Sequence, residues 1–399
     1  MNVIFLTMSR ISEVSSRGIY TDLMRKFRDE GHQVYIVTPH ERYMGKPTRL
    51  IEVDGVHVLG VKTLNLRNTN IVEKGLGQVL VETQYKRAIK HYLPGVQFDL
   101  ILYSTPPITL LGVVKYLKNK NPKAVSYLLL KDIFPQNAVD LGMFGKKSLI
   151  YMYFRKKEKA LYKHSDYIGC MSPANVEFIR KHNPTVAPET VEVAPNSVEL
   201  YGKNLICKKD EIRAKFGLPT DKPVFIYGGN LGKPQGIPFL IECLKANADR
   251  TDCHLLVIGT GTELPKLKAW YNNNHPQSVT VMDGLPQDEY DVLVRSCDVG
   301  LIFLDHRFTI PNYPSRLLSY LENKMPVLCA TDPNCDMGPI AETNGYGYWC
   351  ESDSVESFTS ILDRMIRSDV KAMGENAYKF LCENYLIDNT YNAIKKHFQ

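Results

Sequence analysis

Short apolar runs rich in β-branched and aromatic residues alternate with amphipathic helical patterns along almost the whole chain, and this alternation constrains the fold most strongly. Strands that alternate with helices are typical of parallel sheets joined by crossover helices. The expected strands are residues 3–7, 34–38, 56–61, 100–103, 124–130, 167–171, 191–194, 224–227, 254–258, 279–282, 299–304 and 327–330. The predicted fold class is therefore α/β.

The pattern pauses between about residues 197 and 222, near the middle of the 399-residue chain. A chain of this length is expected to form two domains of about 200 residues each. We therefore predict two Rossmann-like, doubly wound domains, at 1–200 and 201–384. A C-terminal helix at about 385–399 is expected to pack back on the first domain.

The composition, with 44% hydrophobic and 23% charged residues, is that of a soluble globular protein. The N-terminal residues lack a basic leader and a cleavage site, so we interpret them as a first strand. Nine cysteines without a CxxC pair favour reduced thiols in a cytoplasmic protein. The histidines are scattered without ligand spacing, and no metal is expected.

The positive charge of the chain lies in its first half. Residues 1–200 contain 28 Lys and Arg against 18 Asp and Glu, whereas residues 201–399 contain 21 against 25. This asymmetry favours an anionic partner for the first domain. Nucleic acid, a membrane surface and a phosphorylated acceptor are all possible anionic partners. A solvated surface without a partner would explain the same asymmetry.

Four strand-to-helix turns of the second half carry residues typical of an anion site. The first, GGNLGKPQG at 228–236, combines four glycines with Lys233, so that an anion can approach backbone N–H groups at a helix start. The second, Gly259-Thr260-Gly261, lacks the third glycine of a dinucleotide fingerprint. The others are Gly284-Leu285-Pro286 and Pro314-Ser315-Arg316, where the helix start is expected to offer free N–H groups and the arginine can make a bidentate phosphate contact. If these turns share one sheet edge, they line a site for a nucleotide diphosphate.

Together with these turns, three stretches of the first half resemble family 4 glycosyltransferases with the GT-B fold. They are LLLKDIFPQNAVDLG (128–142), MSPANVEFIRK (171–181) and VEVAPNSVEL (191–200). The resemblance covers nearly the whole chain and is strongest to enzymes that build bacterial capsule or O-antigen polysaccharides. It implies two domains that face a cleft, and a retaining hexosyltransferase whose donor is a nucleotide-diphosphate sugar.

The resemblance also implies site residues. Lys131 and Asp132 take the catalytic place beside the transferred sugar. Where many relatives have cations in the glycine turn, this chain has Asn230 and Gln235, which leaves Lys233 and Arg316 for the diphosphate. The full expected donor site is Gly18, Gly229, Asn230, Lys233, Gln235, Gly261, Gly284, Leu285, Ser315, Arg316, Leu317, Ser319 and Glu322.

One departure from the family pattern lies in the helix after Ser315. Relatives commonly carry two glutamates separated by seven residues, of which the second contacts the donor ribose. Pro311 and Ser319 occupy those positions here. Glu322, one turn further on, can reach the same helix face, or it can be a solvated residue.

The activity implied is transfer of a hexose or N-acetylhexosamine, with UDP favoured as the nucleotide, to a glycan linked to polyprenyl diphosphate. No cofactor or metal is expected, because a leaving phosphate oxygen can take the proton of the acceptor. The alternatives are a UDP-sugar epimerase of the same architecture and a catalytically degenerate nucleotide-sugar-binding protein. Nucleic-acid binding is disfavoured.

Residues 146–163 (KKSLIYMYFRKKEKALYK) combine seven cations with apolar residues at helical spacing. Such a helix can lie on an anionic membrane, or it can pack Leu149, Met152, Tyr153 and Leu161 into its own domain. A second set of cations can instead meet a polyprenyl-diphosphate acceptor: Arg42, Lys46, Arg49, Lys62 and Arg67. Either partner would place the protein in the cytoplasm, at the inner face of the cell membrane.

Overall fold

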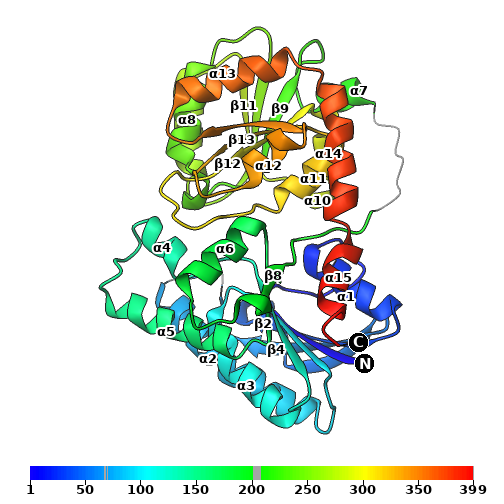
Figure 1. Cartoon of the computed structure of the whole chain (residues 1–399). Helices are drawn as coiled ribbons and strands as arrows, with labels where there is room; N and C mark the ends of the chain where they lie inside the picture. The colour runs from blue at the N-terminus through cyan, green and yellow to red at the C-terminus, as the bar shows by residue number, and fades with distance from the viewer. Residues whose placement is uncertain (67–68, 70, 201–207, 399) are drawn as a thin grey trace. The chain divides into compact units, whose positions relative to one another are not determined.

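Figure 1 shows a computed structural model of the chain, which describes residues 1–66, 69, 71–200 and 208–398. The chain divides into two compact units. Unit 1 comprises residues 1–199 and 387–399, and unit 2 comprises residues 200–386. Arg67, one of the cations considered for the acceptor, lies outside the described residues.

Unit 1 is built on an eight-stranded sheet with the order β3-β4-β2-β1-β5-β6-β7-β8. The strands are β1 (Asn2–Leu6), β2 (Gln33–Glu41), β3 (Arg49–Val53), β4 (Val56–Thr63), β5 (Leu100–Thr105), β6 (Val125–Leu130), β7 (Tyr167–Cys170) and β8 (Val191–Val193). The helices are α1 (Ile19–Asp29), α2 (Ile71–Tyr92), α3 (Leu111–Lys120), α4 (Gln136–Asp140), α5 (Leu149–Lys163), α6 (Pro173–His182) and α15 (Ile387–Lys395), with short 3-10 turns such as η2 (Ile108–Leu110). The sheet is parallel except where β3 pairs antiparallel with β4.

Strand β3 was not expected from the sequence. It forms a hairpin with β4 through Asp54 and Gly55, whose φ angles are 51° and 73°. Positive φ at both central residues is the geometry of a tight hairpin turn, for which Asp-Gly is a strong sequence signal. The predicted strand–helix alternation therefore has an exception at this edge of the sheet, where an additional strand pairs antiparallel with β4.

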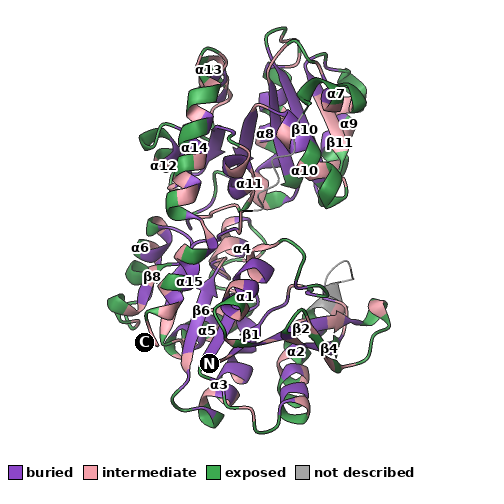
Figure 2. Cartoon of the chain, turned by 90° about the vertical axis from the view of Figure 1, so that its right-hand side faces the viewer, coloured by how far each residue is buried: buried purple, intermediate pink, exposed green. Residues whose placement is uncertain are grey.

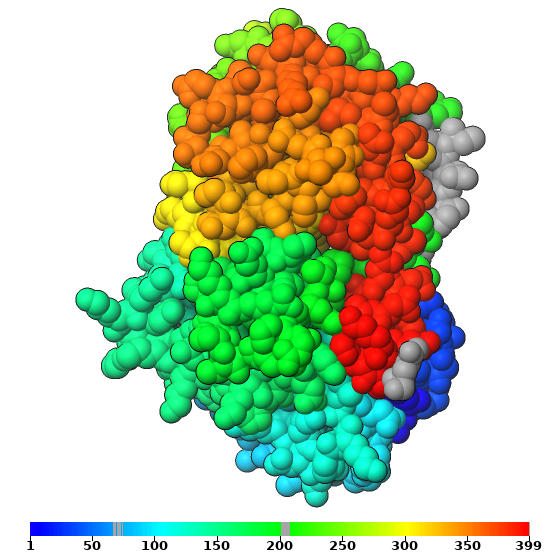
Figure 3. Space-filling view, viewed as in Figure 1, coloured from blue at the N-terminus to red at the C-terminus, as the bar shows by residue number. Residues whose placement is uncertain are grey.

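The C-terminal helix α15 belongs to unit 1 and packs on α1 (Figure 1). The ring of Tyr391 meets the ring of Phe27 edge-on at 5.0 Å, and Thr390 donates a hydrogen bond to the buried carbonyl of Pro195 at 2.9 Å. Ile387, Tyr391 and Ile394 are members of the unit 1 core. Figure 3 shows the end of the chain, in red, beside the N-terminal segment, in blue.

Unit 2 contains a six-stranded parallel sheet with the order β11-β10-β9-β12-β13-β14. The strands are β9 (Val224–Asn230), β10 (His254–Thr260), β11 (Val279–Asp283), β12 (Val299–Phe303), β13 (Val327–Thr331) and β14 (Gly347–Glu351). The helices are α7 (Lys209–Lys215), α8 (Ile237–Ala246), α9 (Leu264–Asn274), α10 (Gln287–Ser296), α11 (Arg316–Glu322), α12 (Met337–Thr343), α13 (Val355–Ile366) and α14 (Val370–Asn384), and η4 (Lys233–Gln235) is a 3-10 turn. Edge strand β14 was missed because its side chains are only partly buried.

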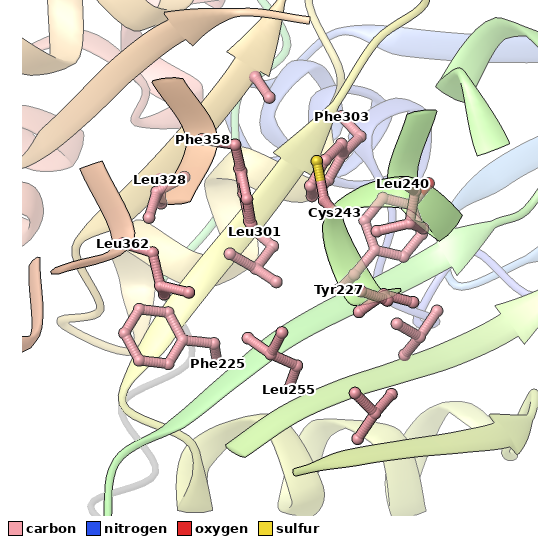
Figure 4. Close-up of a cluster of buried hydrophobic side chains, with 14 of the residues drawn as sticks. Phe225, Tyr227, Leu240, Cys243, Leu255, Leu301, Phe303, Leu328, Phe358 and Leu362 are labelled. Carbon is pink, nitrogen blue, oxygen red and sulfur yellow. The ribbon is translucent and has the colours of Figure 1, made fainter. Parts of the chain in front are cut away.

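Counted from β9, this strand order is 3-2-1-4-5-6, the order of the Rossmann fold, and it reverses between β9 and β12. Buried strands lie between helices whose outer faces are exposed (Figure 2). In the core of unit 2, side chains of β9, such as Phe225 and Tyr227, meet Leu240 of α8 and Phe358 of α13 (Figure 4). The prediction of two doubly wound α/β domains is confirmed.

Within the described ranges, none of the helices combines the length and the apolar character that crossing a bilayer requires.

Candidate functional site

The ends of three neighbouring strands in unit 2 enclose a pocket of about 350 Å³. Its lining residues are Gly229, Asn230, Ile258, Gly259, Thr260, Gly284, Leu285, Gln287 and Tyr290. They come from the carboxyl ends of β9, β10 and β11 and from the start of α10. Ligands of doubly wound sheets bind at this edge, beside the point where the strand order reverses. The structure therefore brings together four predicted donor residues: Gly229, Asn230, Gly284 and Leu285.

Glycines allow the backbones of two of these strands to meet at the edge of the pocket. A Cβ added to Gly259 would overlap the carbonyl oxygen of Gly229, and a Cβ added to Gly261 would overlap the backbone of Leu231. The Leu231 N–H donates to the Thr260 carbonyl at 2.8 Å, which ties the two turns together. Gly261, predicted to touch the donor, instead lies at this packing contact and is absent from the pocket lining.

The first glycine turn is stabilised by its own polar side chains. The Gln235 side-chain oxygen accepts hydrogen bonds from the Asn230 amide at 2.9 Å and from the Gly232 N–H at 3.1 Å. Gly236 ends the turn in the left-handed region with φ 57°. Lys233 begins η4 and is exposed, and it does not line the pocket. Asn230 and Gln235 thus hold the shape of the turn, while the lysine extends into solvent.

Arg316 lies against the end of β9. Its guanidinium carbon is 4.3 Å from the centre of the Tyr227 ring, and a Cβ added to Gly229 would lie 3.6 Å from the same carbon. Among the described residues, its Nη1 is buried and has no hydrogen-bond partner. A buried N–H donor without a partner is costly, so it marks a place where a ligand acceptor is expected.

Two further tyrosines surround the same strand end. The Tyr320 hydroxyl accepts from the Gly228 N–H and donates to the Ile226 carbonyl, both at 3.1 Å. A Cβ at Gly228 would overlap the hydroxyl of Tyr290, which lines the pocket. Sequence reasoning missed Tyr227 and Tyr290. Tyr227 ends an apolar strand and was interpreted as a core residue only, and Tyr290 falls within an ordinary amphipathic helix pattern.

The start of α11 corrects one sequence expectation, that its backbone N–H groups are free for an anion. The Leu317 N–H donates to the Pro314 carbonyl at 3.3 Å, and the Leu318 N–H donates to the Ser315 carbonyl at 3.1 Å. These tight bonds satisfy the first turn internally. The Leu317 side chain is fully buried in unit 2, whereas Ser315 is exposed. The N–H groups of Leu317 and Leu318 are therefore occupied, and the guanidinium of Arg316 is the charged group at this helix start.

Ser319 and Glu322 are both half-buried on α11. Residues three apart lie on the same side of a helix, so both extend from the same face of α11.

The remaining predicted residues lie in unit 1. The Gly18 N–H donates to the Asp22 carboxylate at 3.0 Å, and the Gly18 carbonyl accepts from the Asp22 N–H at 2.8 Å. Gly18 is therefore engaged in capping α1. Its φ of 169° is extended backbone that any residue can adopt.

Lys131 and Asp132 follow β6 and make separate contacts. The Lys131 ammonium donates to the buried carbonyl of Ala194 at 3.2 Å. Both carboxylate oxygens of Asp132 accept from the Asn137 side-chain amide, at 2.8 and 2.9 Å. Burial lowers the pKa of Lys131 to about 7 and raises the pKa of Asp132 to about 6. Perturbed groups of this kind are frequent at functional sites.

The other sequence candidates are placed as follows. Arg42 forms an ion pair with Glu73 at 2.9 Å, while Lys46, Arg49 and Lys62 are exposed. In the described ranges, no group of three or more His, Cys, Asp or Glu side chains is arranged to hold a metal ion. The described cysteines are all free thiols.

Comparison with known proteins finds similarity in both sequence and fold. Residues 208–380 match the model of the glycosyl transferases group 1 family. The chain is 22% identical over 337 residues to a probable glycosyltransferase, WbjE of Pseudomonas aeruginosa. This match covers 82% of this chain and 79% of WbjE.

Two solved structures share the fold. Sucrose-phosphate synthase of Thermosynechococcus elongatus matches with a TM-score of 0.76 at 14% identity, over 100% of this chain and 98% of that one. Anabaena Alr3699/HepE in complex with UDP matches with a TM-score of 0.67 at 14% identity, over 100% and 99%. The fold is the GT-B fold of glycosyltransferases.

Proposed function

We propose that this protein transfers a hexose or N-acetylhexosamine from a nucleotide-diphosphate sugar, with UDP favoured, to a glycan acceptor. The match of residues 208–380 to the glycosyl transferases group 1 family supports this proposal. The acceptor is linked to polyprenyl diphosphate, the anomeric configuration is retained, and the product enters a bacterial surface polysaccharide. The observation that carries the proposal is the unpaired Arg316 Nη1 beside Gly229, which lines the strand-end pocket.

The pocket suits the nucleoside half of the donor. Backbone groups of Gly284 and Leu285 lie where a base can be held, and Tyr290 supplies an aromatic wall. Apolar walls with a few polar groups are typical of small-molecule sites. Ser319, with Glu322 one turn later, takes the side of the ribose and stands in for the family's glutamate.

The diphosphate half lies toward Arg316. Its guanidinium and the Lys233 ammonium meet the negative charge that develops on the leaving group, which is where electrostatic stabilisation accelerates transfer most. Ser315, the turn that contains Asn230 and Gln235, and Gly261 of the second turn keep these cations near the strand end. A leaving phosphate oxygen then takes the acceptor's proton, so the proposed reaction uses neither an external base nor a metal.

Lys131 and Asp132 act on the transferred sugar in this proposal, and Gly18 contacts the donor. Their pKa values of about 7 and about 6 leave an ammonium and a carboxylate together in the interval between. Such a pair can donate to one sugar hydroxyl and accept from another, which orients the reacting carbon. The enzyme works in the cytoplasm at the inner face of the membrane, where Lys46, Arg49 and Lys62 of unit 1 meet the acceptor diphosphate.

A radiolabel assay tests the proposal. The full-length protein is incubated with UDP-sugars with and without a polyprenyl-diphosphate-linked glycan, and the anomeric configuration of the product is determined by NMR. We expect transfer only when the acceptor is present, with the donor configuration kept. An epimer formed without acceptor would instead indicate an epimerase. Donor binding without transfer or hydrolysis over long incubation would indicate a degenerate binding protein.

A further inference from the structure

Helix α5 of unit 1 is firmly attached through one face. Its buried residue Glu158 accepts a hydrogen bond from the Tyr162 hydroxyl at 2.8 Å and forms an ion pair with Arg155. The Phe154 ring meets the Phe134 ring edge-on at 4.9 Å. Ser148 caps the helix by accepting from the Tyr151 N–H at 3.2 Å. The helix is therefore an ordered platform, and its outer face is not free to turn inward.

The outer face of α5 carries large apolar side chains in solvent. Leu149 is 79% exposed, Ile150 55%, Met152 51% and Tyr153 46%, and Met143 in the preceding loop is 65% exposed. We refer to these five residues as the α5 patch. Residues spaced by three and four positions are neighbours on a helix surface. Leu149 is paired in this way with Met152 and Tyr153, and Ile150 with Tyr153, so the four helical members form one contiguous area. Of the four residues that could have packed into the domain, only Leu161 does so.

Cations frame the α5 patch at both ends. Lys146 and Lys147 precede the helix, and Lys156 and Lys157 follow one turn after Met152 and Tyr153. The Lys157 ammonium lies 5.9 Å from the centre of the Tyr153 ring. Within the described part of the chain, Lys146, Lys147 and Lys156 are exposed and form no ion pair. Their charges are available to an external anion.

A second exposed apolar set shows what is specific about α5. Leu76, Val79 and Leu80 on α2 are 54%, 60% and 42% exposed. Glu73 and Glu82 lie on either side of this set along α2. Glu73 is neutralised by its ion pair with Arg42, and Glu82 accepts from the Gly112 N–H. These two flanking residues therefore offer no counterpart to the lysines around the α5 patch, which attract an anionic surface.

We propose that the α5 patch inserts into the headgroup region of an anionic lipid bilayer, with Lys146, Lys147 and Lys156 contacting lipid phosphates. Apolar side chains on one helix face with lysines around them are the composition of a helix that lies in the membrane interface. Lysine side chains can reach phosphate oxygens while their hydrocarbon stems cover apolar surface. This inference deepens the proposed function, because an acceptor anchored in lipid requires an enzyme at the bilayer.

Vesicle flotation of the full-length protein tests the proposal. The probes are vesicles of pure phosphatidylcholine and vesicles in which about a third of the lipid is phosphatidylglycerol. We expect the protein to float with the anionic vesicles and much less with the neutral ones. The triple variant Leu149→Ser/Ile150→Ser/Met152→Ser should weaken binding by at least about tenfold. The variant Lys146→Glu/Lys147→Glu/Lys156→Glu should weaken it by roughly a hundredfold.

Two matched controls accompany these variants. Leu76→Ser/Val79→Ser/Leu80→Ser removes the exposed set on α2, and Lys215→Glu/Lys371→Glu/Lys379→Glu reverses three exposed lysines of unit 2. Both should bind anionic vesicles within about twofold of the wild type, since charge and insertion act locally. Near-wild-type binding of the α5 variants would overturn the proposal. So would a wild type that does not float, or an α5 serine variant whose only effect is to turn a dimer into a monomer.

The vesicle readout is independent of catalysis. A thermal-shift titration with UDP on each α5 variant should give the wild-type response, because the α5 patch lies outside the donor pocket of unit 2. Vesicle binding without any response to UDP would contradict the proposed function and leave this inference intact. A response to UDP without vesicle binding would contradict this inference and leave the proposed function intact.

Discussion

The guanidinium of Arg316 stacks on the ring of Tyr227, with 4.3 Å between the guanidinium carbon and the ring centre. Tyr227 is fully buried, and its hydroxyl donates to the Asn230 carbonyl at 2.7 Å. A rigid aromatic ring therefore holds a cation at the end of β9 before any ligand arrives. Preorganised charge of this kind needs little rearrangement when a diphosphate binds.

Removing the ring beneath Arg316 should weaken donor binding. A cation–π contact contributes about 0.5–2 kcal/mol, so Tyr227→Leu should lower UDP affinity by roughly 3- to 30-fold in calorimetry. Tyr227→Phe keeps the ring and should bind UDP nearly as the wild type does. Tyr348→Leu is the matched control. The guanidinium carbon of Arg364 lies 3.8 Å from the centre of the Tyr348 ring, and neither residue lines the pocket. Equal losses in Tyr227→Leu and Tyr348→Leu would argue against the assignment.

The exposed lysine of the glycine turn should contribute a screened charge. Lys233→Ala is expected to lower UDP affinity by about tenfold at low salt, since hydrogen bonds to charged groups contribute about 1.5–3 kcal/mol. The loss should shrink as salt rises, because exposed charges are screened. Lys245→Ala, an exposed lysine in the last turn of α8, should have no effect. A salt-independent loss would indicate a structural role for Lys233.

Alanine substitutions at two glycines are expected to have opposite effects on stability, because one glycine lies where β9 and β10 meet and the other faces open space on α2. Gly259→Ala places a methyl group on the Gly229 carbonyl oxygen and should cost at least about 2 kcal/mol of unfolding free energy, with loss of UDP binding. Gly75→Ala, where nothing lies within 4 Å, should instead stabilise α2 by about 1 kcal/mol. Urea unfolding measures both. A neutral Gly259→Ala would show that the strand ends can separate.

The shifted groups of unit 1 predict a pH-dependent stability. The pKa of Lys131 falls from its usual 10.5 to about 7, so between these values the unfolded chain binds a proton that the folded chain does not. Stability therefore rises with pH across this window, and the charged lysine costs most below pH 7. Lys131→Met should raise Tm most near pH 6 and little near pH 10. Lys120→Met, an exposed control, should show no such trend.

Burial of Asp132 makes folding stability change with pH in the opposite direction. Its pKa rises from 3.8 to about 6, so the folded chain holds the extra proton and stability falls as pH rises through this interval. Asp132→Asn should raise Tm above pH 6 and leave it unchanged below pH 4. A Tm increase for either variant that is the same at every pH would contradict the burial of these two groups.

The strand–helix alternation and the glycine turns were enough to predict the fold class and the strand ends that form the pocket. The position of Arg316 at a helix start beside the first glycine turn could be predicted as well, and its role toward the diphosphate stays a prediction. Tyr227 could not, because hydrophobic periodicity treats the last residue of a buried strand as core and carries no information on what stacks above it. The sequence also could not predict that the N–H groups of Leu317 and Leu318 form hydrogen bonds within the helix start, because these bonds depend on local backbone geometry.

The outer face of α5 shows another limit. Apolar residues at helical spacing predict an amphipathic helix, but they do not say which side the domain covers. Leu149 and Leu161 are equally apolar, yet the first is exposed and the second is buried. Only the contacts of Phe154 and Glu158 determine which face packs inward.

The central claim is that Arg316 binds the diphosphate of the donor and not its nucleoside. Isothermal titration of UDP and of uridine into the wild type and Arg316→Ala tests it most directly. We predict that the wild type binds UDP more tightly than uridine, and that Arg316→Ala removes most of this difference while uridine affinity stays the same. An unchanged UDP affinity in Arg316→Ala, or equal losses for UDP and uridine, would contradict the account.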